Sequence, residues 1–68
     1  MTDIRRNIGN RIADIRKSKG LTALQLSEMT GLQRCNITRV ELGRYNTTID
    51  TLGKIADALN CDIDFVEK

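Results

Sequence analysis

The stretch TALQLSEMTGLQRCNITRVELG, residues 22–43, decides the fold because it contains the signals for two short helices separated by a tight turn. Thr22 and Gln25 predict a capping box at the start of the first helix, in which each side chain bonds a free amide of the first turn. Gly31 ends that helix after about eight residues, since glycine adopts the left-handed conformation at little cost. The second helix is predicted from near Arg34 to Leu42, just before the next glycine.

A turn of about three to four residues containing glycine, between two such helices, is typical of the helix-turn-helix arrangement. Ser27 is small enough for the helices to cross closely, and the predicted apolar anchors are Leu26, Leu32, Ile37 and Val40. The second helix then presents polar side chains outward: Gln33, Arg34, Cys35, Asn36, Thr38 and Arg39. A helix fits the DNA major groove, and these side chains suit base edges and phosphates. Each arginine taken singly is also compatible with a solvated surface charge.

The flanking segments predict further helices and no strand. From about Asp3 to Ser18, isoleucines at helical spacing form one apolar stripe: Ile4, Ile8, Ile12 and Ile15. Thr48 is expected to cap another helix that Asn60 ends, with the core stripe Ile49, Leu52, Ile55, Ala56 and Leu59. Asp62 is expected to cap a last short turn, in which Phe65 closes the core. The predicted fold class is all-α, in one compact domain over residues 1–68.

Charge is distributed unevenly along the chain. Residues 1–46 carry nine basic and four acidic side chains, a net charge of +5, whereas residues 47–68 carry two basic and five acidic, a net charge of −3. A basic body with an acidic end indicates either a polyanionic partner approached by one face or a solubilising surface.

Composition argues against several other classes of protein. The chain has no histidine, no paired-carboxylate signature and no glycine-rich phosphate loop, so an enzyme is a poor interpretation and no metal site is expected. The apolar runs are too short for a membrane span or a signal peptide. Cys35 and Cys61 are too few for a disulfide framework, so we expect reduced thiols and a cytoplasmic protein.

A larger, ordered set of residues carries a family resemblance. The set is Leu21-Thr22, Leu26-Ser27-Glu28, Thr30-Gly31-Leu32, Ile37, Arg39-Val40-Glu41, Gly43, Arg44-Tyr45-Asn46, Leu52, Lys54-Ile55-Ala56 and Ala58-Leu59. At these spacings it resembles the phage-repressor/Cro (XRE) family of helix-turn-helix domains, over nearly the whole chain. The resemblance implies a compact five-helix, lambda-repressor-like domain that binds double-stranded DNA, usually as a homodimer, and regulates transcription without a cofactor or a small-molecule substrate.

The resemblance also implies roles for individual residues. Base contacts fall at Gln33, Arg34, Cys35, Thr38 and Arg39. Phosphate contacts fall at Thr22, Ala23, Asn36, Arg44, Tyr45 and Asn46. Arg16 and Glu41 are expected to pair in a structural salt bridge between the first helix and the recognition helix, with two unrelated surface charges as the alternative.

This sequence departs from the family pattern at three of these positions. Ala23 stands where a phosphate-binding glutamine is frequent, and Gln33 stands where serine or threonine usually caps the recognition helix. Cys35 lies where a polar base reader is common. Three interpretations of Cys35 are open: its thiol packs against a thymine methyl, its thiol is redox-sensitive, or it is a small residue tolerated at this position.

Two functional interpretations remain open at this point. The first is a transcriptional repressor that blocks polymerase by occupying a promoter. The second is a DNA-binding antitoxin or protein-interaction module of the same fold, which a stoichiometric protein partner would favour. Leu24, Leu42 and Val66 are candidates for a dimer contact, although single exposed leucines are common.

Overall fold

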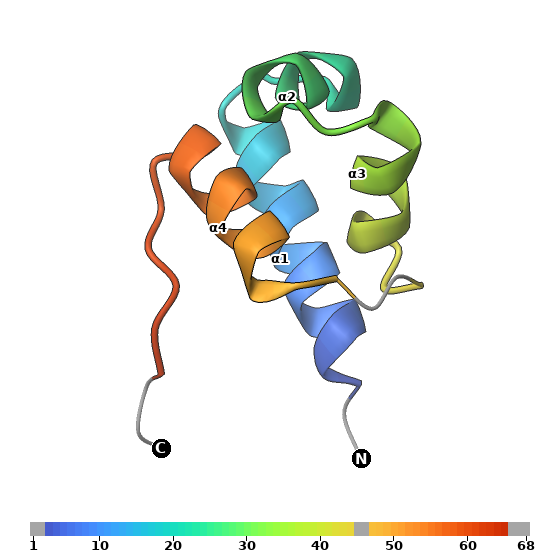
Figure 1. The fold of residues 1–68 in the computed structure, drawn as a ribbon, viewed down its shortest axis with the longest axis vertical. Coiled ribbons are helices and arrows are strands. Elements are labelled where there is room, and N and C mark those ends of the chain that lie inside the picture. Colours follow the sequence, from blue (N-terminus) through green and yellow to red (C-terminus); the bar gives the residue numbers. More distant parts are fainter. Residues whose placement is uncertain (1–2, 45–46, 66–68) are drawn as a thin grey trace.

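The computed structural model describes residues 3–44 and 47–65. Within these ranges the chain forms four helices and no strand: α1 (Ile4–Ser18), α2 (Ala23–Thr30), α3 (Arg34–Glu41) and α4 (Ile49–Ala58). Figure 1 shows α3 and α4 on different sides of α1, with α2 lying across one end of the group. The all-α prediction is confirmed, and α2 with α3 forms the helix-turn-helix that the sequence predicts.

Local signals set the helix ends. The Thr22 hydroxyl accepts from the Gln25 amide at 3.0 Å, and the Gln25 side chain accepts from the Thr22 amide at 2.8 Å, so the predicted capping box is present. Gly31 ends α2 in the left-handed conformation, with φ of +75°. Thr48 caps α4 by accepting from the Thr51 amide.

The core is small and draws on all four helices. Its buried apolar residues are Ile12, Leu26, Ile37, Val40, Ile55 and Leu59. Ser27 is also buried, as the close crossing of α2 and α3 requires. Contacts join α1 to α3, α2 to α3 and α2 to α4. The helix-turn-helix is therefore held from behind by α1 and α4, which leaves the other side of α3 free of the core.

The end of the chain differs from the prediction. The described residues form four helices in place of the five that the family resemblance implies, and the turn expected at Asp62 is absent from residues 61–65. Phe65 is fully exposed, so the expectation that it closes the core was wrong. Among residues 61–65 only Cys61 packs against the core, and so short a segment with little packing cannot nucleate a stable helix. Val66 lies outside the described residues, as do Tyr45 and Asn46.

An apolar groove of about 530 Å³ lies between α1, α4 and residues 61–65. Ile4, Ile8 and Ile49 line it and remain exposed, so the stripes predicted for α1 and α4 are only partly buried. Leu24 and Leu42 are also exposed, in agreement with their predicted position away from the core. No helix among the described residues has both the length and the apolar character needed to cross a bilayer.

Candidate nucleic-acid interface

The outer face of α3 is defined by what its inner face buries. Ile37 is fully buried and Val40 is 4% exposed, which fixes the rotation of the helix about its axis. The exposed residues on α3 and at its start are Gln33, Arg34, Cys35, Thr38 and Arg39. The structure thus places all five residues that the resemblance assigns to base contacts at solvent-facing positions of one short element.

Side chains on the outer face of α3 make two hydrogen bonds, one between two side chains and one to the backbone. Gln33 is the N-cap residue, and its side chain makes no capping hydrogen bond, as expected for glutamine. Its carbonyl oxygen instead accepts from the Cys35 thiol, with Sγ and Oε1 3.6 Å apart. The Thr38 hydroxyl donates to the Arg34 carbonyl at 3.1 Å. Because the hydroxyl proton of Thr38 is bonded within α3, this exposed side chain has only oxygen lone pairs left and can act as an acceptor.

The turn between α2 and α3 is fixed by hydroxyl groups. The Thr30 hydroxyl donates to the Leu26 carbonyl at 2.9 Å and accepts from the Leu32 amide at 3.2 Å. The Ser27 hydroxyl donates to the Leu24 carbonyl at 2.6 Å. This role of Thr30 goes beyond its place in the family pattern. The available signal was a hydroxyl residue directly before the glycine that ends the helix.

Arg16 and Glu41 form a two-pronged ion pair between α1 and α3. Nε of Arg16 donates to Oε2 of Glu41 at 2.7 Å, and Nη2 donates to Oε1 at 3.0 Å. The remaining terminal nitrogen, Nη1, donates to the Leu21 carbonyl at 2.8 Å. The side chains are only 12% and 11% exposed. The pair therefore ties the recognition helix to α1 and to the loop before α2.

The ion pair also affects ionisation. Hydrogen bonding to Glu41 raises the pKa of Arg16 above its ordinary value, against the opposing effect of burial. Arg16 is therefore charged at neutral pH. Three of the five N–H donors of the guanidinium are used internally and the side chain is only 12% exposed, so at most two donors remain for a phosphate.

The described residues assigned to phosphate contacts lie at the start of α2, on α3 and in the loop after α3. Arg44 is exposed in the loop after α3, and Asn36 is half-buried. Thr22 is exposed, but its amide is already bonded to Gln25, so the half-buried Ala23 and the residue after it supply the unused amides at the start of α2. Tyr45 and Asn46 lie outside the described residues.

Gly9, for which the sequence predicted no role, positions α1 against α3. A Cβ atom on Gly9 would lie 2.3 Å from the Val40 carbonyl oxygen and 2.7 Å from that of Glu41. No side chain fits this crossing, so the two backbones meet directly. A glycine inside an amphipathic helix was the available signal, since it lowers helix stability unless packing requires it.

Comparison with known proteins agrees with this geometry. The HTH_3 helix-turn-helix family matches residues 12–66. The immunity repressor protein of Bacillus phage phi105 is 37% identical over 59 residues, which are 87% of this chain and 41% of the repressor. The uncharacterised HTH-type transcriptional regulator y4dJ of Sinorhizobium fredii is 35% identical over 84% of this chain and 74% of its own length.

A solved structure is similar as well. The restriction-modification controller protein C.AhdI from Aeromonas hydrophila superposes with a TM-score of 0.81 at 32% identity, over 84% of this chain and 86% of the controller. The family match covers most of the chain, including the whole of α2, the turn and α3. The chain therefore belongs to the XRE-type helix-turn-helix family of DNA-binding transcriptional regulators.

Proposed function

We propose that this chain binds specific sites in double-stranded DNA by placing α3 in the major groove, and that it acts as a transcriptional repressor. The observation that carries the proposal is the exposed face of α3, which presents Arg34 and Arg39 on a helix held from behind by Ile37 and Val40. The major groove presents a distinct donor and acceptor pattern for each base pair. The proposal includes no catalytic step and no cofactor.

The side chains of α3 suit different base edges. Arg34 and Arg39 carry planar guanidinium groups that donate in pairs to O6 and N7 of guanine. Thr38 donates internally to the Arg34 carbonyl, so toward DNA it acts as an acceptor for the amino group of adenine or cytosine. Gln33 uses its carbonyl for the Cys35 thiol, which leaves its amide nitrogen to donate to a base acceptor. Cys35 contributes an apolar contact to a thymine methyl.

Phosphate contacts hold the domain in register on the duplex. Arg44 lies in the loop after α3 and supplies a cation at the edge of the groove. The unused amide of Ala23 lies at the N-terminus of α2, where the helix dipole favours an anion. Asn36 completes the described set, and Tyr45 and Asn46 keep this assignment from the family pattern.

The short recognition helix supports dimerisation, and the phage relative supports repression. An eight-residue recognition helix reaches only a few base pairs, so two copies bound to adjacent half-sites supply the specificity that one lacks. A homodimer over a promoter blocks polymerase without further chemistry. The name of the related phage protein, an immunity repressor, supports repression over activation. A regulator of this kind works in the cytoplasm, where the chromosome is accessible.

Selection of bound sites from a random duplex pool tests this proposal. The expected result is a short consensus in two inverted copies, bound far more tightly than a scrambled duplex of equal length. Sedimentation of the complex should give two chains per duplex. Recovery of sequences no richer in any motif than the starting pool would contradict the proposal.

A further inference from the structure

The first turns of α1 lie directly against the end of the recognition helix. A Cβ atom on Gly43 would lie 2.6 Å from Cα and 2.9 Å from N of Arg6, so the loop after α3 touches the backbone of α1. One turn further along α1, Gly9 meets the Val40 and Glu41 carbonyls in the same way. These two close approaches leave no room for side chains between the elements. The start of α1 is therefore fixed relative to the loop that carries Arg44.

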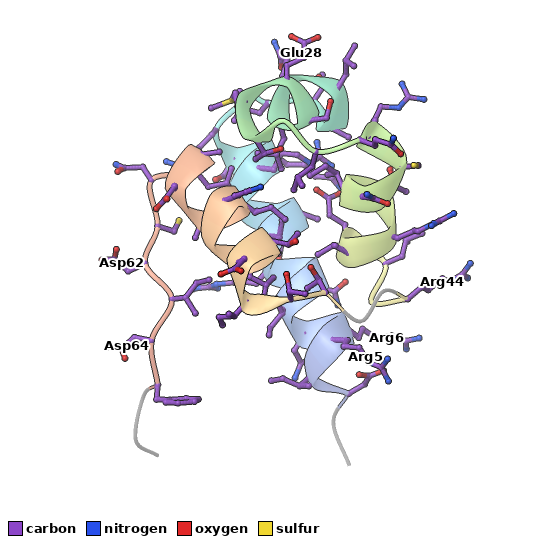
Figure 2. All side chains as sticks on the ribbon, viewed as in Figure 1. Arg5, Arg6, Glu28, Arg44, Asp62 and Asp64 are labelled. Carbon is purple, nitrogen blue, oxygen red and sulfur yellow. The ribbon has the colours of Figure 1, made fainter. Side chains whose placement is uncertain are left out.

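This packing gathers three arginines beside the proposed DNA surface. Figure 2 shows Arg5, Arg6 and Arg44 together, pointing away from the molecule on the side where α3 lies. The labelled acidic side chains Glu28, Asp62 and Asp64 lie elsewhere, beyond α2 and along residues 61–65 (Figure 2). The three labelled arginines are thus separated from the three labelled acidic side chains, and Asp3 is the carboxylate that lies beside Arg5.

The side chains of Arg5 and Arg6 make few interactions within the fold. Arg6 is exposed, and within the part of the chain that the structure describes its guanidinium makes no hydrogen bond or ion pair. Arg5 approaches only Asp3, at 3.9 Å, with the two side chains 55% and 51% exposed. Exposed pairs of this kind contribute little to stability. Both cations are therefore available to an external anion.

We propose that Arg5 and Arg6 form a second phosphate-contact site, which continues the DNA-backbone surface from Arg44 onto α1. The inference rests on the proposed function, because it assumes that α3 enters the major groove of a duplex. The strand at the edge of that groove then passes Arg44 first and the start of α1 next. Contacts to phosphate oxygens position a protein without reading sequence, so this site adds affinity that is equal for all sequences.

Two arginines on α1 provide a matched test. Arg6→Gln removes the charge at the proposed site. Arg11→Gln removes the same charge from the same helix, but at an exposed residue that lines the apolar groove between α1 and α4. Arg6→Lys restores the charge in place. Each variant and the unmodified chain are titrated with the selected duplex and with a scrambled one at several salt concentrations, and each is melted without DNA.

The expected result separates a phosphate contact from a general charge effect. Arg6→Gln should lower affinity for both duplexes by the same factor and reduce the slope of log affinity against log salt by about 0.9, the value for one neutralised phosphate. Arg6→Lys should restore the slope, and Arg11→Gln should leave it close to that of the unmodified chain. All variants should melt alike, because both arginines are exposed.

Four results would overturn the inference. Equal slope changes for Arg6→Gln and Arg11→Gln would show a diffuse charge effect in place of a site. A lower melting temperature for Arg6→Gln with an unchanged slope would assign Arg6 to the dipole at the end of α3. A normal slope in Arg6→Gln, with base preference still dependent on Arg39, would refute this site and leave the proposed function standing. Failure of the unmodified chain to prefer any duplex would refute both.

Discussion

Arg16 of α1 and Glu41 of α3, 25 positions apart in the chain, form a two-pronged ion pair at 2.7 and 3.0 Å and are both nearly buried. The third hydrogen bond of Arg16, to the Leu21 carbonyl, adds the loop before α2 to the same junction. One guanidinium therefore sets the relation between α1, the helix-turn-helix and the surface that α3 presents.

Glu41→Gln should destabilise the domain markedly. The substitution keeps the shape of the side chain but leaves the Arg16 charge without its counter-ion in a site that water barely reaches. The expected loss is about 2–3 kcal/mol, which corresponds to a fall in melting temperature of roughly 10 °C or more in a chain of this size. Thermal unfolding followed by circular dichroism measures it.

Glu28→Gln is the control for that loss, because Glu28 is exposed on α2. It should melt within about 0.5 kcal/mol of the unmodified chain. The raised pKa of Arg16 means that its contribution is fully present below the ordinary arginine pKa and is lost only as pH rises through the raised value. Titration of Arg16 should therefore not change the stability difference between the two variants between pH 6 and 9. Equal melting of the two variants would remove the structural role of the pair.

Two helical glycines should respond to alanine with opposite signs. Gly9→Ala places a Cβ atom 2.3 Å from the Val40 carbonyl oxygen, so α1 must move off α3. The expected cost is about 1–3 kcal/mol. Gly53, within α4, has no neighbouring atom within 4 Å of an added Cβ, so Gly53→Ala should stabilise by about 0.5–1 kcal/mol through higher helix propensity. Chemical denaturation of both variants tests the pair, and the same sign for both would contradict the crossing described here.

Features encoded by neighbouring residues could be predicted from the sequence. The capping box of Thr22 and Gln25, the end of α2 at Gly31 and the inner face of α3 at Ile37 each depend on a few adjacent positions. The pairing of Arg16 with Glu41 came from the family resemblance, because nothing in the spacing of two distant residues brings them together.

Features that depend on packing between distant segments could not be predicted in the same way. The core stripe predicted for α4 is confirmed at Ile55 and Leu59 but wrong at Ile49, which is 69% exposed because nothing among the described residues covers that end of the groove. Phe65 looked like a core residue by type alone, but the segment that carries it does not turn back onto the helices. The approach of Gly43 to Arg6 is likewise a product of how α1 and α3 cross.

Gln33→Ser should raise stability while altering recognition. Serine accepts a hydrogen bond from the first-turn amides of α3, which the Gln33 side chain does not. The expected gain is about 0.5–1 kcal/mol in the free energy of unfolding. The same substitution removes an amide donor from the proposed base-reading set, so preference at one position of the selected site should weaken. Unchanged preference together with higher stability would exclude Gln33 from base reading.

Arg44→Ala should weaken binding to every duplex alike. The side chain is exposed in the loop after α3, where a cation meets phosphate and not a base edge. The expected change is a salt slope smaller by about 0.9, with an unaltered ranking of site variants. Lys17→Ala, at the far end of α1, is the control and should leave the slope unchanged. A change in ranking after Arg44→Ala would mean that Arg44 reads bases.

If the exposed face of α3 reads base pairs, removal of the Arg39 side chain should change the base preference of the domain. The affinities of the unmodified chain and of Arg39→Ala are measured for the selected duplex and for each of its single base-pair substitutions. Arg39→Ala should lose about 1–3 kcal/mol of discrimination at one base pair and keep its preferences at the others. A preference profile identical to that of the unmodified chain would contradict base reading by this face.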